Sequence, residues 1–274
     1  MPSAFITGAS SGIGRAFAEQ LAARGYDLTL VARATTSLED TAAALQRPGR
    51  QVRVQVLTAD LVTETGIDRV TTSLESQVPD LLVNSAGMGL SGTFPFTDIA
   101  AEEAQLRLNV AAVMRTTHAA LPGMLRRNAG AVLNVTSVAA CGPVWLANTY
   151  PASKSWVLSF TESIARSAAL QASGVRVMAV LPGYTRTAFH ARAGMSTHHL
   201  PTWMWLSPEQ VARAALRDLS RGRLLSIPSW RYKTAVWGMR HLPHRLTAAL
   251  GWDFSTGQGT HATSPPASST GTRA

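Results

Sequence analysis

Short apolar runs alternate along the chain with longer segments of helical periodicity. Seven runs of four to six residues lack a strict apolar–polar alternation, which is typical of strands buried on both faces. They are Ala4–Thr7, Asp27–Ala32, Val52–Leu57, Leu81–Asn84, Ala131–Thr136, Arg176–Leu181 and Leu224–Ile227. Between them, apolar residues recur at spacings of three and four, as in Ala16–Ala23, Leu106–Leu125 and Val157–Leu170. This alternation predicts an α/β fold: a doubly wound, Rossmann-like parallel sheet of about seven strands with helices on both faces.

No linker interrupts the alternation, so we expect a single domain over residues 1–250. Residues 256–274 are rich in Gly, Ser, Thr and Pro and hold almost no large apolar side chain. Such a segment cannot bury enough surface to offset the entropy of ordering, which predicts a disordered tail. The chain opens without a basic leader segment. The uncharged residues 128–153 contain too many polar residues and prolines to span a bilayer, so we expect a cytoplasmic protein.

Composition narrows the classes further. The 274 residues are 46% hydrophobic and 15% charged, which is ordinary for a globular protein and excludes a collagen-like or coiled-coil architecture. Cys141 is the single cysteine, so an internal disulfide framework and a multi-cysteine metal site are excluded. The net charge of +9 would permit nucleic-acid or membrane contact, but the chain carries no recognised nucleic-acid-binding motif.

The positive charge is concentrated near the C-terminus, where Arg221 to Leu250 holds six basic residues and no acidic one. Within it, residues 230–250 have the pattern of a basic amphipathic helix. This helix either docks on its own domain or a second subunit, or lies on an anionic membrane. We favour docking, because Gly238 and Pro243 would weaken an isolated helix.

A glycine-rich turn follows the first predicted strand. Its sequence is Thr7-Gly8-Ala9-Ser10-Ser11-Gly12-Ile13-Gly14, with the spacing G-x-x-x-G-x-G. A strand, a glycine-rich turn and a helix in this order direct backbone N–H groups and the positive end of the helix dipole at a phosphate. Glycine is needed because a Cβ would keep the backbone away from a pyrophosphate. Tight turns without any ligand also use glycine, so this motif alone does not establish a nucleotide site.

Further motifs follow in a family-specific order. They are Asp60-Leu61, Asn84-Ser85-Ala86-Gly87, Asn109, Ser137, Tyr150-Pro151-Ala152-Ser153-Lys154 and Pro182-Gly183. With these motifs the chain resembles the short-chain dehydrogenase/reductase family over about residues 4–230. It departs from the family at Ser85, where a second Asn is usual, and at Leu181, where Asn is common before Pro-Gly.

The resemblance implies an oxidoreductase with Ser137, Tyr150, Lys154 and Asn109 as catalytic residues. Tyr150 would exchange the substrate proton, Ser137 would hold the substrate oxygen, and Asn109 would hold a water in the proton relay. From the residues alone, Tyr150 and Lys154 are four apart and share a helix face. A lysine ammonium beside a phenol favours phenolate, so we expect Lys154 to lower the pKa of Tyr150. A tyrosine packed on a helix beside an exposed lysine would show the same spacing.

The resemblance also implies a set of cofactor-binding residues, among them Lys154, which would bind the ribose. The others are Gly8, Ser10, Ser11, Gly12, Ile13, Gly14, Asp60, Leu61, Asn84, Ala86, Gly87, Tyr150, Pro182, Gly183, Thr185 and Thr187. The second predicted strand ends in Ala32-Arg33, where an NAD-binding protein needs a carboxylate for the ribose 2′-hydroxyl. Arg33 offers a guanidinium to a 2′-phosphate, and Arg15 adds positive potential, so we expect NADP(H) in preference to NAD(H).

Residues 186–206 are rich in large apolar side chains and are expected to form a lid over a bulky apolar substrate. The lid also contains His190, His198 and His199, but neither a carboxylate nor a thiolate accompanies them, so we expect no metal. The expected activity is reduction of a carbonyl, or oxidation of the matching secondary alcohol, by a homodimer or homotetramer. The alternatives are a nucleotide-sensing protein without catalysis and a membrane-surface interaction protein on the same fold.

Overall fold

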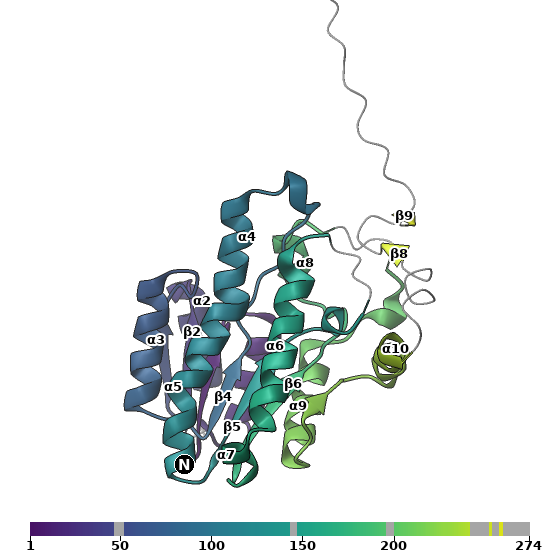
Figure 1. Cartoon of the computed structure of the whole chain (residues 1–274). Coiled ribbons are helices and arrows are strands. Elements are labelled where there is room, and N and C mark those ends of the chain that lie inside the picture. The colour runs from purple at the N-terminus through teal and green to yellow at the C-terminus, as the bar shows by residue number, and fades with distance from the viewer. Residues whose placement is uncertain (47–51, 143–146, 196–199, 242–251, 254–257, 260–274) are drawn as a thin grey trace, which may run out of the picture.

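The computed structural model describes residues 1–46, 52–142, 147–195, 200–241, 252–253 and 258–259. At its centre is a parallel sheet of seven strands in the order β3-β2-β1-β4-β5-β6-β7 (Figure 1), which confirms the predicted fold class. The strands are β1 (Ser3–Thr7), β2 (Asp27–Ala32), β3 (Val54–Thr58), β4 (Leu81–Asn84), β5 (Gly130–Val135), β6 (Val175–Val180) and β7 (Leu225–Ser226). Each falls within about two residues of the run that predicted it.

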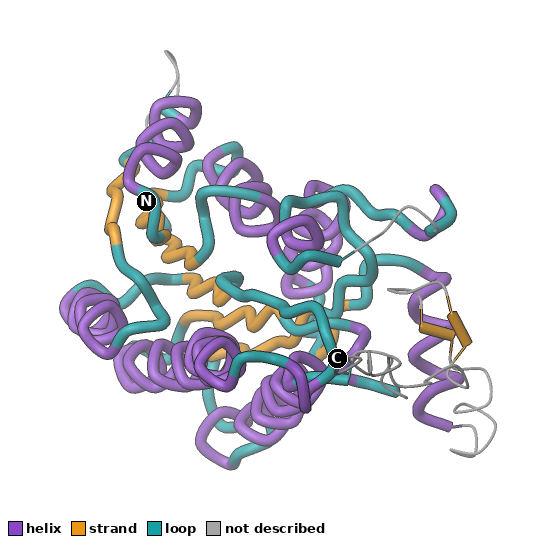
Figure 2. The backbone as a smooth tube through the Cα atoms, turned by 90° about the horizontal axis from the view of Figure 1, so that it is seen from above, coloured by secondary structure: helices purple, strands orange, loops and turns teal. Residues whose placement is uncertain are grey.

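Two layers of helices cover the sheet, one on each face (Figure 2). The helices are α1 (Gly12–Ala22), α2 (Thr35–Leu45), α3 (Glu64–Ser76), α4 (Ile99–Leu106), α5 (Ala112–Arg126), α6 (Thr149–Ala165), α7 (Ala168–Gln171), α8 (Phe189–Arg192), α9 (Pro208–Ser220) and α10 (Trp230–His241). One buried apolar cluster joins α1, α2 and α9 to the sheet, and a second joins α3 and α5 to its other face. Burial on both faces explains why the strands lack an alternating pattern.

The helix predicted over Leu106–Leu125 starts earlier and contains a distortion. It begins at Ile99, where the Asp98 side chain caps the helix by accepting a hydrogen bond from the Ala100 backbone at 3.0 Å. Residues Arg107–Ala111 form a π-helical turn between α4 and α5. Periodicity at 3.6 residues does not reveal such a turn, because it adds only about one residue to the helical repeat. The turn contains the buried Asn109.

A buried polar network connects β4 and β5 to the helices above them. The Asn84 amide nitrogen donates to Asn134 Oδ1 at 2.9 Å and to Thr117 Oγ1 at 3.1 Å. Thr116 Oγ1 donates to Asn84 Oδ1 at 2.9 Å, and the Asn134 amide nitrogen donates to Thr161 Oγ1 at 3.0 Å. Because the partners come from β4, β5, α5 and α6, the network fixes these elements relative to one another.

α10 packs on its own domain. The Tyr232 hydroxyl accepts a hydrogen bond from the Tyr184 backbone at 3.0 Å and donates one to the Met204 carbonyl at 2.8 Å. Val236 is buried, and Arg240 forms an ion pair with Glu162 of α6 at 3.4 Å. Pro243 and the rest of the predicted helix lie outside the described residues.

The expected tail also lies mostly outside the described residues. Only Gln258–Gly259 (β9) belongs to it there, and this strand pairs with Trp252–Asp253 (β8). No helix within the described parts of the chain is long and apolar enough to cross a membrane.

Candidate functional site

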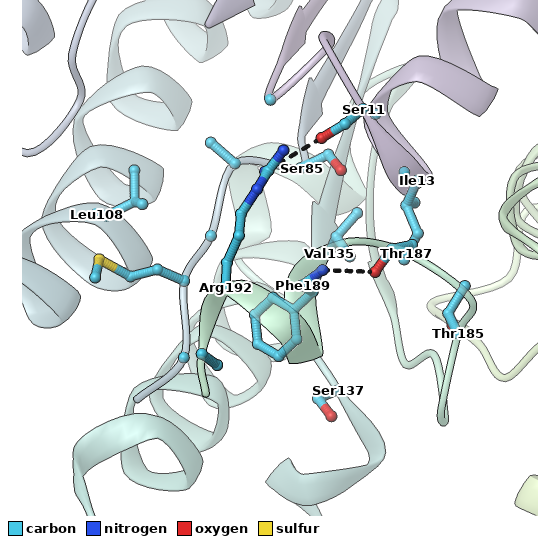
Figure 3. A pocket seen from close by; sticks show the side chains of 18 of the residues that line it. Ser11, Ile13, Ser85, Leu108, Val135, Ser137, Thr185, Thr187, Phe189 and Arg192 are labelled. Atoms are coloured by element: carbon cyan, nitrogen blue, oxygen red, sulfur yellow. Dashed lines mark hydrogen bonds between the residues drawn. The ribbon is translucent and has the colours of Figure 1, made fainter. Parts of the chain in front are cut away.

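A large cavity of about 760 Å³ opens at the C-terminal edge of the sheet, where parallel α/β sheets bind their ligands. It runs from Arg33 after β2 to Tyr150 on α6, and Figure 3 shows part of its lining. Eighteen of the predicted site residues line it: Gly8, Ser10, Ser11, Gly12, Ile13, Gly14, Arg33, Asp60, Leu61, Ala86, Gly87, Ser137, Tyr150, Lys154, Pro182, Gly183, Thr185 and Thr187. Asn84 and Asn109 do not line the cavity.

The glycine-rich turn lies against the turn that follows β4. Gly8 has a positive φ of 69°, and a Cβ there would lie 2.9 Å from the backbone of Ala86. A Cβ on Gly14 would lie 2.3 Å from the Gly8 carbonyl oxygen. Thr7 Oγ1 accepts hydrogen bonds from the backbone of Ser85 and Ala86, both at 3.1 Å. The glycines therefore allow two backbones and the start of α1 to meet at the cavity.

Two charged residues, Arg33 and Asp60, lie at the end of the cavity next to β2 and β3. Arg33 follows β2 and is exposed, so its guanidinium is accessible to an anionic group. Asp60 follows β3, and its Oδ1 accepts a hydrogen bond from the Val62 backbone at 3.1 Å. It is the only carboxylate side chain among the residues that line this cavity. With three basic residues in the same lining, the electrostatic potential favours an anionic ligand.

The side chains of Asn148, Glu102 and Gln105 fix the start of α6, which carries Tyr150. Asn148 Oδ1 accepts a hydrogen bond from the Tyr150 backbone at 3.0 Å. Glu102 of α4 is buried, and its carboxylate accepts hydrogen bonds from both the backbone and the hydroxyl of Thr149. Gln105 donates to the same Thr149 hydroxyl at 2.7 Å. α4 therefore determines where the first turn of α6, and with it Tyr150, is placed.

Ser137, Tyr150 and Lys154 lie together at the opposite end of the cavity from Arg33. Lys154 is buried, its Nζ donates to the Val135 carbonyl at 3.2 Å, and it lies 5.8 Å from the centre of the Tyr150 ring. The expectation of a lowered phenol pKa is wrong for this structure. Burial raises the pKa of Tyr150 to about 12, although hydrogen bonding with Ser137 acts to lower it. Burial also lowers the pKa of Lys154 to about 8. For Tyr150, desolvation thus outweighs the hydrogen bond with Ser137.

The two asparagines act from outside the cavity. Asn109 Oδ1 accepts from the Met88 backbone at 3.0 Å, and its amide donates to the Met88 carbonyl at 2.9 Å and to Ser153 Oγ at 3.1 Å. It thus holds the chain after Gly87, and its role in a proton relay stays a prediction. Asn84 belongs to the buried network beneath the cavity. Both therefore position the residues that do line it.

The structure shows where two residues of the lid, Phe189 and Arg192, lie in the cavity. The Phe189 ring lies 5.5 Å from the Tyr150 ring, between centroids, so it covers the phenol. On the same helix, Arg192 Nη1 lies 3.3 Å from Ser11 Oγ in the glycine-rich turn (Figure 3). Neither position follows from the apolar pattern of the lid, because the contacts depend on how α8 turns back over the cavity.

Of the three lid histidines, the structure describes only His190. His190 lies between the rings of Phe189 and Trp205, at 5.4 and 5.3 Å between centroids, and burial lowers its pKa. His198 and His199 lie outside the described residues. Within the described ranges, no cluster of three or more His, Cys, Asp or Glu side chains is placed to hold a metal ion.

Comparison with known proteins places the chain among dehydrogenases. Residues 2–196 match the sequence model described as short chain dehydrogenase. A solved short-chain dehydrogenase from Sphingobium yanoikuyae in complex with NADPH is 35% identical, with a TM-score of 0.79 over 86% of this chain and 92% of that one. The bulky-bulky ketone specific alcohol dehydrogenase from Comamonas testosteroni is 31% identical, with a TM-score of 0.75 over 87% and 92%. A very-long-chain 3-oxoacyl-CoA reductase from Anas platyrhynchos is 32% identical over 78% of this chain and 67% of its own.

Proposed function

This chain belongs to the short-chain dehydrogenase/reductase family, and we propose that it is an NADP(H)-dependent oxidoreductase that reduces a carbonyl group on a bulky apolar substrate, or oxidises the matching secondary alcohol. The observation that carries the proposal is that one cavity joins Arg33 to the phenol of Tyr150. A dinucleotide lying along this cavity would have the glycine-rich turn beside its middle and the Tyr150 phenol, as the acid, beside its reacting end.

The residues of the cavity fit NADP(H). The backbone at Gly12, Ile13 and Gly14 forms the start of α1, whose dipole favours the diphosphate. Arg33 would bind the 2′-phosphate, and Asp60 with Leu61 would border the adenine. Pro182, Gly183, Thr185 and Thr187 would border the nicotinamide. The cofactor supplies the hydride.

Tyr150 is suited to donate a proton. With a pKa of about 12, its phenol stays protonated throughout the neutral range. An alkoxide is far more basic than a phenolate, so proton transfer from the phenol to it is still downhill. Ser137 lies beside the phenol and would hold the same substrate oxygen. These features support the reductive direction.

The substrate end of the cavity is apolar. Met88, Val138, Phe189, Met195 and Leu200 line it. Such walls favour a ketone or 3-oxoacyl compound with large apolar groups, in agreement with the substrates that the names of two relatives give: a bulky-bulky ketone and a very-long-chain 3-oxoacyl-CoA. A panel of ketones and 3-oxoacyl thioesters of increasing chain length, followed by NADPH absorbance, tests this preference.

Tyr150→Phe tests the catalytic assignment. The substitution removes only the hydroxyl, so turnover should fall at least about 100-fold while NADPH affinity stays within about twofold. Turnover follows from NADPH absorbance and affinity from NADPH fluorescence. Retention of a tenth of the wild-type rate would exclude Tyr150 as the acid.

Arg33→Asp tests the choice of cofactor. The wild type should prefer NADPH to NADH in kcat/KM. The variant should reverse this preference, because a charge-assisted hydrogen bond to the 2′-phosphate becomes a repulsion. Arg24→Asp, an exposed change outside the cavity, is the control and should leave the ratio unchanged. A wild type that prefers NADH would contradict the assignment.

We also propose that the protein is a homo-oligomer. α4 and α5 follow one another along one helical course and α6 lies beside it (Figure 1); the three helices expose large apolar side chains, namely Ile99, Leu106, Met114 and Trp156. Exposed apolar groups gathered on neighbouring helices are typical of a subunit interface. Light scattering coupled to size exclusion distinguishes a dimer or tetramer from a monomer.

A further inference from the structure

Arg192 connects the lid to the phosphate-binding turn across 181 positions of sequence. Its guanidinium Nη1 lies 3.3 Å from Ser11 Oγ, and both residues line the cavity (Figure 3). Among the residues that the structure describes, no carboxylate lies within 4.0 Å of it. A guanidinium that faces a cavity without a carboxylate partner retains its capacity to bind an anion.

The other side of this contact is the start of α1. Ser11 is the N-cap residue of α1, but its side chain makes no capping hydrogen bond. The first backbone N–H groups of the helix consequently keep their capacity for an acceptor at the cavity surface. A diphosphate placed there would meet the helix dipole from one side and the Arg192 guanidinium from the other.

The position of Arg192 also determines that of Phe189. The two residues are three apart on α8 and lie on one helical turn, so a displacement of one displaces the other. Phe189 is held from below by its backbone N–H, which donates to Thr187 Oγ1 at 3.2 Å, and its ring covers Tyr150. At the base of the lid, the Arg186 backbone N–H donates to the Leu206 carbonyl at 2.9 Å.

We propose that Arg192 binds the diphosphate of the dinucleotide and thereby holds α8 closed, with Phe189 as a wall of the substrate pocket. The inference rests on the proposed function, since it takes the ligand of the glycine-rich turn to be NADP(H). Binding of the dinucleotide would then precede that of the substrate, because the pocket wall is complete only when Arg192 is engaged.

Binding of nucleotide fragments tests the first half of the proposal. ADP-ribose carries the diphosphate without the 2′-phosphate, and 2′-AMP carries the 2′-phosphate without the diphosphate. Arg192→Ala should weaken NADPH and ADP-ribose about tenfold, or about 1.4 kcal/mol, and leave 2′-AMP unchanged. Arg192→Lys should retain part of the affinity. Arg33→Ala should show the opposite pattern for the two fragments. NADPH fluorescence and calorimetry give the affinities.

A matched control is available on the same lid. The Arg186 guanidinium lies 5.5 Å from the Trp205 ring centre, and Arg186 does not line the cavity. Arg186→Ala should therefore leave all three affinities unchanged. An equal loss for both arginine variants, or no loss of ADP-ribose affinity for Arg192→Ala, would overturn the proposal.

Amide hydrogen exchange of residues 188–195 tests the second half. NADPH should slow their exchange in the wild type and fail to do so in Arg192→Ala at saturating NADPH. Protection that persists in the variant would overturn the proposed closure. If the wild type bound neither NADPH nor ADP-ribose, the proposed function would fail together with the inference. If it bound both and Arg192→Ala changed nothing, only the inference would fail.

Discussion

Replacing Lys154 by Met should stabilise the protein while it inactivates the site. Lys154 is buried, and its pKa falls from 10.5 to about 8 because the charged form loses its hydration. This difference corresponds to about 3 kcal/mol of free energy that the folded state loses at neutral pH by holding the charge. Methionine has a similar length and no charge, so it removes this cost. Loss of the hydrogen bond to the Val135 carbonyl opposes the gain by about 1 kcal/mol.

The pH dependence gives the sharper measurement, because packing changes are the same at every pH. Below pH 8, Lys154 is charged in both the folded and the unfolded state, and the wild type carries the full cost. Between pH 8 and 10.5, the folded state releases its proton while the unfolded state keeps it, so wild-type stability rises with pH. The advantage of Lys154→Met should therefore be about 1 kcal/mol smaller at pH 9 than at pH 7.

Guanidinium unfolding at both pH values, without nucleotide and at one protein concentration, measures the difference. Lys233 is the only other lysine of the chain and is exposed on α10, so Lys233→Met is a matched control that should change stability at neither pH. An advantage of Lys154→Met that is equal at pH 7 and pH 9, or that Lys233→Met shares, would refute desolvation as the origin of the shifted pKa.

Two further predictions concern the supports of the site. Glu102→Gln should lower kcat and lower the free energy of unfolding by about 1–3 kcal/mol, because the amide cannot accept all the hydrogen bonds from Thr149 and Thr97. Burial raises the pKa of Glu102, but these hydrogen bonds lower it more, so the pKa lies below its usual value of 4.5. In urea unfolding, the wild type should therefore be more stable than Glu102→Gln by the full amount above pH 4.5, and this difference should disappear as the pH falls below the lowered pKa. Tyr232→Phe should cost about 1–2 kcal/mol, measured by thermal unfolding, because both hydrogen bonds of the Tyr232 hydroxyl are lost. A Tyr232→Phe variant as stable as the wild type would show that α10 does not brace the lid.

The sequence was informative wherever a local pattern determines the structure. Strands buried on both faces leave unbroken apolar runs, and a tight turn between a strand and a helix needs glycine, so the strands and the glycine-rich turn were located to within a few residues. Tyr150 and Lys154 were predicted on one helix face because four residues separate them. The structure places both on α6, at the cavity.

Features that depend on distant contacts were not predictable. The direction of the pKa shift of Tyr150 depends on how deeply the phenol is buried, and spacing along a helix does not reveal depth. The contact of Arg192 with Ser11 joins residues 181 positions apart in the sequence. The π-helical turn at Arg107–Ala111 is stabilised by contacts of Asn109 with Met88 and Ser153, which belong to separate elements.

The buried asparagine pair has a consequence for how the sheet assembles. Asn84 and Asn134 lie opposite each other in the register of β4 and β5. A slip of two residues would set Asn84 against Val132 or Thr136 and separate the two amides. Each buried amide left without a partner costs about 1–3 kcal/mol, whereas the neighbouring apolar side chains tolerate such a slip far better. The pair therefore favours the native register of β4 and β5 during folding, because a shifted pairing of these two mostly apolar strands separates the two amides.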